Sequence, residues 1–170
     1  MGEEIAKILA KKQAKLALFA RREQKLKNLM KETGLDKNHC MYQTCDVSKE
    51  EDVENAVQAT LDAFDHIDVA ILSAGVLVPN PIQTFDAKLI KQSIDINFMG
   101  VVYAVSHLLP VMKRQKYGMI AALSTLPDRR GVPGWGAYGA SKAAISWLME
   151  SLRAEAKQRY NIDIITVKPG

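Results

Sequence analysis

The stretch Val-Ala-Ile-Leu-Ser-Ala-Gly at residues 69–75 is a short apolar run that stops at three small residues. A run of this length is typical of a buried strand, because a helix usually needs at least about ten residues. Similar runs recur at 16–20, about 38–45, 119–123 and 162–167. We therefore expect five strands that are covered on both faces, as in parallel sheets.

Helical patterns fill the intervals between these runs. Apolar residues recur every three or four positions at 5–9, 26–30, 53–64, about 86–116 and about 138–159. Gly34 is placed to end the second helix, and Ser48 with Glu51 matches a capping box before the third. The alternation of strands and helices predicts a single α/β domain over 1–170, with a doubly wound parallel sheet.

The chain carries 23 Lys and Arg against 19 Asp and Glu, a net charge of +4, and the excess lies near its start. Residues 1–37 hold ten basic and five acidic side chains. A basic segment can bind nucleic acid, but this one lacks the interleaved aromatic rings that stack on bases. We interpret it as the solvated faces of two helices with at most one anion site, and we expect no nucleic-acid partner.

Composition also argues against a membrane protein, a secreted protein and a metal-binding protein. No apolar run approaches the roughly 18 residues that a membrane span needs, and residues 1–4 lack the basic start of a secretory signal. Cys40 and Cys45 are too few for a disulfide scaffold and do not fit the common zinc spacings. We expect a cytoplasmic protein with two reduced thiols and neither a metal nor a membrane partner.

Ligands of parallel sheets bind beyond the carboxyl ends of the strands. The residues at these positions are Arg21, Arg22, Asp46, Val47, Ser73, Ala74, Gly75, Ser124, Thr125, Pro169 and Gly170. We expect the binding site of the protein among them.

Tyr138 and Lys142 are four residues apart and therefore share a face of the predicted helix at 138–159. An ammonium beside a phenol lowers the pKa of the phenol from about 10, so that the tyrosine can exchange a proton near neutral pH. For an isolated pair, an ordinary helical tyrosine with a surface lysine is the simpler interpretation. The hydroxyls of Ser124 and Thr125 strengthen the catalytic interpretation, because that strand end and the helix start share an edge of the sheet.

Asn97 falls where the long helical region is expected to bend, near 97–100, and an amide at a kink can hold a water against the freed backbone. Taken in order, the motifs are Asp46-Val47, Ser73-Ala74-Gly75, Ile96-Asn97-Phe98-Met99-Gly100, Ser124-Thr125, Tyr138-Gly139-Ala140-Ser141-Lys142 and Pro169-Gly170. Together they resemble the classical short-chain dehydrogenase/reductase family over essentially the whole chain. The resemblance implies a Rossmann-like fold and an oxidoreductase that interconverts a secondary alcohol and a ketone by hydride transfer.

The resemblance also implies roles for the candidate catalytic residues. Tyr138 would be the general acid and base, and Lys142 would lower its pKa and hold the nicotinamide ribose. Asn97 would anchor a water in a proton relay. A serine-type hydroxyl would position the substrate oxygen. The usual family spacing of thirteen residues before Tyr138 points to Thr125, whereas Ser124 requires a loop one residue longer, and both stay candidates.

The implied cofactor is a nicotinamide dinucleotide. In the family, an acidic residue after the second strand selects NAD, whereas arginine there favours the 2′-phosphate of NADP. Here Ala20 is followed by Arg21 and Arg22, so we expect NADP(H) and regard NAD as the lesser alternative. The other cofactor contacts that the resemblance implies are Gly2, Asp46, Val47, Ser73, Ala74, Gly75, Tyr138, Lys142, Pro169 and Gly170.

Besides the uncertain position of the catalytic hydroxyl, the chain departs from the family pattern in two further ways. It starts at the helix after the glycine-rich turn, of which Gly2 matches the last glycine, and it stops before the family's C-terminal strand. The expected sheet therefore lacks its first, central strand, and we interpret the chain as a fragment with a partial domain. In addition, Leu72-Ser73 replaces the family's paired asparagines before Ala74-Gly75, which removes an amide that steadies the central strand.

The resemblance implies a small alcohol or ketone as substrate and leaves its identity open. It also implies a homodimer or homotetramer that is built on the helices near 99–116 and 138–158. The alternative hypothesis is a truncated, non-catalytic scaffold that keeps this dimer surface without binding a cofactor.

Overall fold

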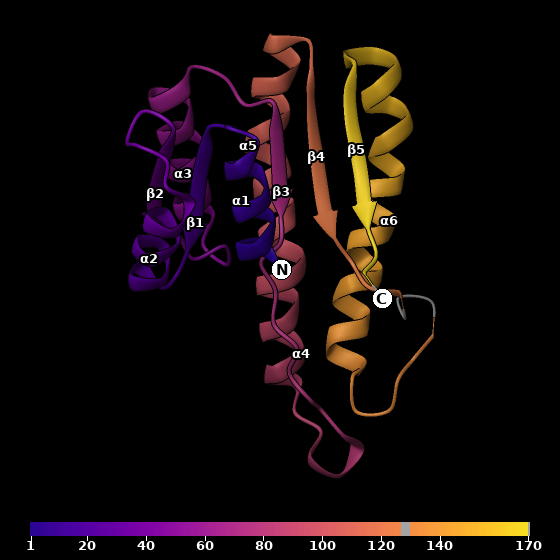
Figure 1. The fold of residues 1–170 in the computed structure, drawn as a ribbon. Helices are drawn as coiled ribbons and strands as arrows, with labels where there is room; N and C mark the ends of the chain where they lie inside the picture. Colours follow the sequence, from indigo (N-terminus) through magenta and orange to yellow (C-terminus); the bar gives the residue numbers. More distant parts are fainter. Residues whose placement is uncertain (127–129, 170) are drawn as a thin grey trace.

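The computed structural model describes residues 1–126 and 130–169 (Figure 1). Its strands are β1 (Leu16–Ala20), β2 (Cys40–Thr44), β3 (Val69–Leu72), β4 (Gly118–Leu123) and β5 (Ile162–Val167). Its α-helices are α1 (Gly2–Lys11), α2 (Glu23–Thr33), α3 (Glu50–Phe64), α4 (Ala87–Ser93), α5 (Gly100–Gln115) and α6 (Gly136–Tyr160). The alternation expected from the apolar runs is confirmed, and most boundaries lie within two residues of the expected ones.

All paired strands run parallel, but they form two separate sheets. One sheet holds β1 and β2, and the other has the order β3-β4-β5. The facing edges of β1 and β3 have no hydrogen-bonded strand between them in the described residues, and Val69 at the start of β3 is 49% exposed. The expectation of a doubly wound parallel sheet without its central strand is therefore confirmed.

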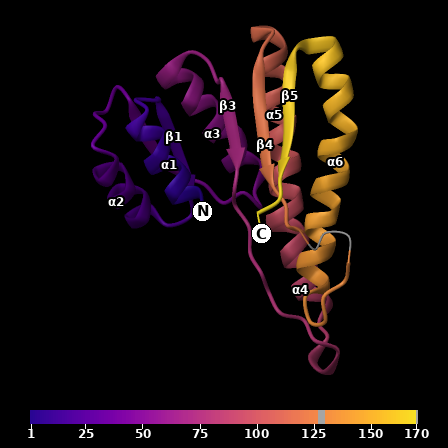
Figure 2. The same cartoon turned by 45° about the vertical axis from the view of Figure 1, so that its right-hand side comes forward.

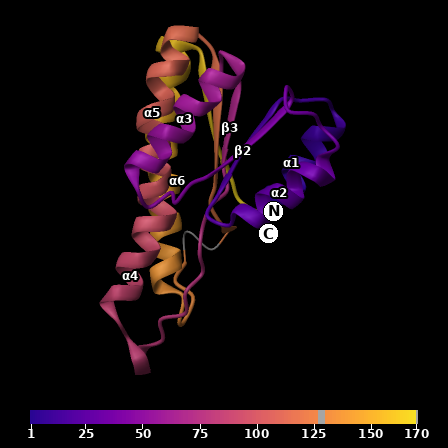
Figure 3. The ribbon, with the colours of Figure 1, turned by 90° about the vertical axis from the view of Figure 1, so that its left-hand side faces the viewer.

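Helices cover both sides of these strands (Figure 3). The helices α3, α5 and α6 lie on one side, where α6 packs along β5 and α3 packs along α5. The helices α1 and α2 lie on the other side and pack against β1 and β2. The larger apolar core includes Met112, Ile120 and Ile145, each fully buried between α5, α6 and the β3-β4-β5 sheet.

The expected bend of the long helical region is a π-helical segment, η2 (Ile94–Met99), between α4 and α5. A π-helix inserts an extra residue into the helical ladder, and such insertions are frequent at functional sites. By length and composition the combined helix Ala87–Gln115 could cross a membrane. Its α5 portion, however, packs against α3, α6 and the sheet, as a core helix does.

The predicted capping box of Ser48 and Glu51 is wrong. The helix α3 begins after Lys49, and no side chain caps its N-terminus. The backbone N–H and the hydroxyl of Ser48 instead both donate to Asp46 Oδ1, at 3.1 and 2.7 Å. Ser48 lies one residue before the N-cap position and binds the carboxylate two residues earlier, so it closes the turn after β2.

The two thiols are free and buried, as expected. Cys40 lies in β2 and Cys45 follows that strand. Burial raises the pKa of the Cys45 thiol to about 11 and also raises the pKa of Cys40. Both side chains therefore stay protonated near neutral pH and act as apolar core residues.

Candidate active site

The carboxyl ends of β3 and β4 point toward the first turns of α6 and toward η2 (Figure 2). This is the edge at which the sequence predicted a site. The candidates that meet here are Gly75, Asn97, Ser124, Tyr138 and Lys142, and the distances among them define the geometry.

Lys142 is the buried cation of the site. The residue is only 5% exposed, and its Nζ donates to the carbonyl of Leu123 at 2.7 Å. The same Nζ lies 5.9 Å from the centre of the Tyr138 ring. Desolvation lowers the pKa of Lys142, because burial disfavours the charged ammonium.

Tyr138 lies half-buried in the first turns of α6, on the same face as Lys142. The ring of Trp135 meets the Tyr138 ring edge-on, with 6.3 Å between centroids and an interplanar angle of 89°. Trp135 is 39% exposed, so this aromatic pair reaches the protein surface. The Tyr138 ring therefore contacts the Trp135 ring and has the buried Lys142 ammonium close to it.

The loop after β3 passes directly over the lysine. A Cβ on Gly75 would lie 3.2 Å from Asn97 Oδ1 and 3.4 Å from Lys142 Nζ. Ser73, Ala74 and Gly75 are all exposed, so the loop has its backbone and small side chains at the surface. A larger residue at position 75 would crowd both functional groups.

Asn97 is fully buried in η2, and its amide is used within the protein. Its Oδ1 accepts from the Val76 N–H at 2.7 Å, and its Nδ2 donates to the Val76 carbonyl at 2.9 Å and to Ser141 Oγ at 2.9 Å. The amide thus joins the loop after β3 to the start of α6. It does not point into open space.

Ser124 and Thr125 differ in what their hydroxyls contact. Ser124 is 3% exposed, and its Oγ donates to the Lys142 carbonyl at 3.0 Å and accepts from Ser146 Oγ at 2.8 Å. Thr125 is half-buried, and its hydroxyl makes no hydrogen bond to the residues that the structure describes. The Ser124 hydroxyl is therefore engaged with α6, whereas the Thr125 hydroxyl is available.

The remaining cofactor candidates lie along the same edge. A Cβ on Gly2 would lie 2.6 Å from Ser73 Oγ, so the N-terminus of α1 touches the end of β3. Arg21 and Arg22 are exposed just after β1. The hydrogen bonds from Ser48 lower the pKa of Asp46, and the nearby charge of Arg21 adds to this effect.

Val47 packs where α5 begins. A Cβ on Gly100 would lie 2.9 Å from Val47 Cγ2, so only glycine permits this close approach. Pro169 is half-buried after β5, and Gly170 lies outside the described residues.

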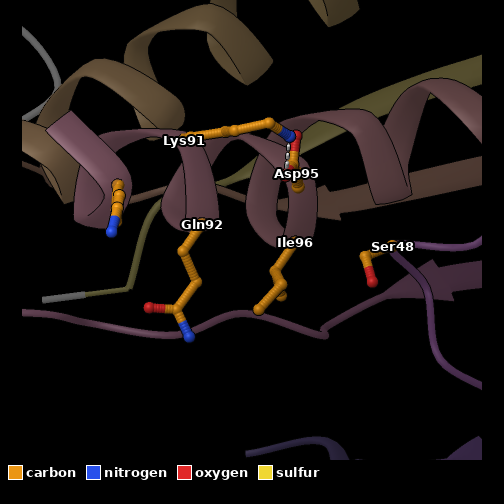
Figure 4. Close-up of a pocket in the computed structure, with 6 residues that line it drawn as sticks. Ser48, Lys91, Gln92, Asp95 and Ile96 are labelled. Carbon is orange, nitrogen blue, oxygen red and sulfur yellow. Dashed lines mark hydrogen bonds and ion pairs between the residues drawn. The ribbon is translucent and has the colours of Figure 1, made fainter.

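Sequence reasoning missed a shallow groove of about 250 Å³ beside this edge (Figure 4). Its lining residues are Ser48, Lys88, Lys91, Gln92, Asp95 and Ile96. An ion pair of 2.6 Å between Lys91 and Asp95 closes one side of it. The groove lies between the turn after β2 and the helical segments α4 and η2.

Sequence reasoning also missed two hydroxyls that support the site, those of Ser141 and Ser146. Ser141 stands inside the quoted motif at three residues after Tyr138, and therefore on the same helix face. That spacing was the available signal for it. Ser146 carries no comparable signal, because its partner Ser124 lies on another element.

Comparisons with known proteins identify the family of the chain. A family profile described as short chain dehydrogenase matches residues 1–170. An uncharacterized oxidoreductase of Listeria monocytogenes is 34% identical over 171 residues, which cover 100% of this chain and 69% of that protein. The 11-beta-hydroxysteroid dehydrogenase A of Sesamum indicum is 33% identical, and the match covers 100% of this chain and 49% of that protein.

Solved structures share the arrangement of strands and helices. Levodione reductase superposes with a TM-score of 0.93 and 28% identity, covering 99% of this chain and 66% of that one. An actinorhodin polyketide ketoreductase with NADPH superposes with a TM-score of 0.92 and 26% identity, covering 99% of this chain and 65% of that one. The chain thus spans about two thirds of these structures. It belongs to the short-chain dehydrogenase family of oxidoreductases.

Proposed function

We propose that the protein interconverts a secondary alcohol and a ketone with NADP(H) as cofactor. The observation that carries this proposal is the buried Lys142 ammonium, 5.9 Å from the Tyr138 ring centre, at the carboxyl edge of a parallel sheet. A nicotinamide dinucleotide supplies or accepts the hydride when it is bound. The residues described below bind the reactants and move the proton.

The binding edge fits a dinucleotide. Gly2 contacts Ser73, and a side chain on Gly75 would crowd Asn97 and Lys142, so small residues at both positions keep side chains away from this edge. The unpaired N–H groups at the start of α1 favour a phosphate. Arg21 and Arg22 are exposed beside this helix and match a second phosphate on the ribose.

The proton chemistry is assigned to Tyr138. Its phenol donates a proton to the carbonyl oxygen in reduction and accepts it back in oxidation. Lys142 has three N–H donors, of which Leu123 uses one. The remaining two can bond the phenol oxygen and the ribose of the cofactor, so that a single cation serves both.

We assign the substrate-orienting hydroxyl to Thr125. Ser124 already donates to the Lys142 carbonyl, and its lone pair accepts from Ser146, so it holds the lysine-bearing turn against the end of β4. Because both N–H donors of Asn97 are also used and its oxygen accepts from Val76, we assign the relay water to the main chain of η2.

The test is NADPH oxidation by the purified enzyme with a panel of ketones, and the reverse reaction with secondary alcohols. The proposal predicts turnover with at least one member and a preference for NADPH over NADH. Tight NADPH binding without turnover on any carbonyl would contradict the oxidoreductase proposal. A folded dimer that neither binds NADPH nor turns over a carbonyl would support the scaffold alternative, which the family match does not favour.

We further propose that the enzyme forms a homodimer or homotetramer through α5 and α6, in the cytoplasm. Trp147 on α6 is 78% exposed, which is unusual for so large an apolar side chain. The free, buried thiols of Cys40 and Cys45 support a reducing compartment.

A further inference from the structure

The amide of Asn97 has a fixed orientation because its partners are of opposite kinds. Its oxygen faces the Val76 N–H, and one of its N–H groups faces the Val76 carbonyl. An amide has two N–H donors, and the second donates to Ser141 Oγ at 2.9 Å. Every donor of this buried side chain is therefore satisfied, and the last of them depends on one serine.

The hydroxyl of Ser141 is equally constrained. The residue is fully buried, and its single O–H donates to the Tyr138 carbonyl at 2.7 Å. The hydroxyl must therefore accept, and cannot donate, in its bond with Asn97. The Ser141 hydroxyl therefore binds the main chain of Tyr138, the proposed general acid.

These bonds join three segments that are far apart in sequence. Val76 follows the loop over the site, Asn97 lies in η2, and Ser141 lies in the first turns of α6. A Cβ on Gly75, the neighbour of Val76, would lie 3.4 Å from Lys142 Nζ. The network therefore runs from Tyr138 through Ser141 and Asn97 to the loop that covers the lysine.

Ordinary helix chemistry does not account for this serine. Helical serines often donate to a carbonyl three or four residues earlier, as Ser106 does to Tyr103 and Ser151 does to Trp147. Both of those serines are exposed. Ser141 differs because it is fully buried and also accepts from a side chain 44 residues earlier in the sequence.

We propose that Ser141 is a positioning residue of the active site. Its hydroxyl holds the Asn97 amide and the Tyr138 turn in a fixed relation, so that the phenol, the Lys142 ammonium and the loop at Gly75 stay aligned. The inference rests on the proposed oxidoreductase function for its catalytic consequence. The hydrogen-bond network itself does not depend on that function.

The test compares Ser141→Ala, Ser141→Cys and the matched control Ser151→Ala in the complete enzyme. Ser151 lies on the same helix and makes the same kind of local bond, but it is exposed and has no part in the site. Two quantities are measured: steady-state rates across pH, and hydrogen exchange of the Val76 amide in the cofactor-free protein. The amide reports on Asn97 directly, because it donates to Asn97 Oδ1.

We expect Ser141→Ala to lower kcat by roughly tenfold or more, since small misplacements of reacting groups are costly. The KM for NADPH should change by less than about twofold, and the limb of the pH profile that reports the proton donor should shift. The Val76 amide should exchange faster in this variant. Ser151→Ala should match the wild type in all of these readouts.

Ser141→Cys separates positioning from packing. A thiol fills nearly the same space but is a weak donor and acceptor, so this variant should remain impaired. Recovery of kcat in Ser141→Cys would overturn the proposal and assign Ser141 to packing alone. If Ser141→Ala fails to fold, Ser141→Cys carries the same expectations for rate and exchange.

The rate and the exchange of the Val76 amide distinguish a wrong positioning role from a wrong hydrogen-bond network. Faster Val76 exchange with an unchanged kcat would overturn the positioning role. Unchanged exchange in a folded Ser141→Ala would overturn the network on which the inference stands. An enzyme without any alcohol or ketone turnover would instead contradict the proposed function, and the exchange result would still decide whether Ser141 orients Asn97.

Discussion

The ammonium of Lys142 donates to the backbone carbonyl of Leu123 at 2.7 Å, so the last residue of β4 binds and orients this cation. Ser124, the next residue, returns a hydrogen bond to the Lys142 carbonyl at 3.0 Å. Two hydrogen bonds therefore join Leu123 and Ser124, at the end of β4, to the same residue of α6. This double tie explains how a lysine can stay buried and oriented beside a tyrosine.

Removing the phenol oxygen tests the proton donor. Tyr138→Phe should lower kcat by roughly 100- to 10,000-fold, because general acid–base catalysis contributes about that much. NADPH affinity, measured by fluorescence titration, should stay within about threefold, since the ring and Lys142 remain. Tyr160→Phe, which lies at the far end of α6, serves as the control and should keep its activity. Near-normal turnover in Tyr138→Phe would refute the assignment.

Removing the buried cation changes the pH dependence of stability. In the folded state the pKa of Lys142 is lowered below 10.5, the ordinary value that applies to the unfolded chain. At a pH between the folded and the unfolded pKa, the unfolded chain therefore binds the proton more tightly. The free energy of unfolding should therefore rise with pH across this window, and the cost of burying the charge is fully present below it. Lys142→Met should lose this rise, and it should also lose turnover.

Urea unfolding of the wild type and Lys142→Met at neutral pH and at a pH near 10.5 measures this difference. Lys88→Met, which removes an exposed lysine, is the matched control and should follow the wild type. Parallel pH curves for the wild type and Lys142→Met would show that the ammonium is not buried in the folded protein.

Much of this site could be predicted from the sequence, and the missing parts share one cause. Periodicity predicted that Tyr138 and Lys142 share one face of a helix. It also predicted that residues 73–75 and 124–125 follow the ends of strands, at one edge of the sheet. The bond of Asn97 to Ser141 and the bond of Ser146 to Ser124 were not predictable. Each joins residues from different elements, and their relative placement depends on tertiary packing.

The wrong capping box has a related cause. Ser48 and Glu51 have the correct spacing, but the helix begins one residue later than a capping box at Ser48 requires, and the Ser48 hydroxyl donates to Asp46 instead. A local motif is a reliable guide only when the helix begins at the residue that the motif marks. By contrast, the split sheet followed from the family resemblance, because the family's strand order places the strand that precedes Gly2 in the middle of the sheet.

The two hydroxyls after β4 should separate catalysis from stability. Thr125→Val should lower kcat by about 100-fold or more, as the loss of one donor to a reacting oxygen does, with little effect on unfolding. Ser124→Ala should lower the free energy of unfolding by about 1–2 kcal/mol, since it breaks a buried hydrogen-bond chain, and should retain most of its turnover. Steady-state kinetics and urea unfolding of both variants measure the two effects. The opposite pattern would exchange the two assignments.

The arginines after β1 should decide the choice of cofactor. The double variant Arg21→Ala/Arg22→Ala should raise the KM for NADPH at least about tenfold, because hydrogen bonds from a charged group to phosphate are lost. The KM for NADH should stay nearly unchanged, since NADH has no 2′-phosphate. Steady-state kinetics with both cofactors measures this split. An equal loss for NADPH and NADH would show that these side chains do not contact the 2′-phosphate.

The exposed indole of α6 should matter for assembly. Trp147 is 78% exposed in the isolated chain, so burial of its ring against a second copy would remove a large apolar surface from water. Trp147→Glu would place a charge in that interface and should shift sedimentation toward the monomer, which wild-type enzyme at the same concentration should not show. Ile82→Glu, an equally exposed apolar position on the loop before α4, is the control and should leave the assembly intact. Dissociation by Ile82→Glu alone would move the interface from α6 to that loop.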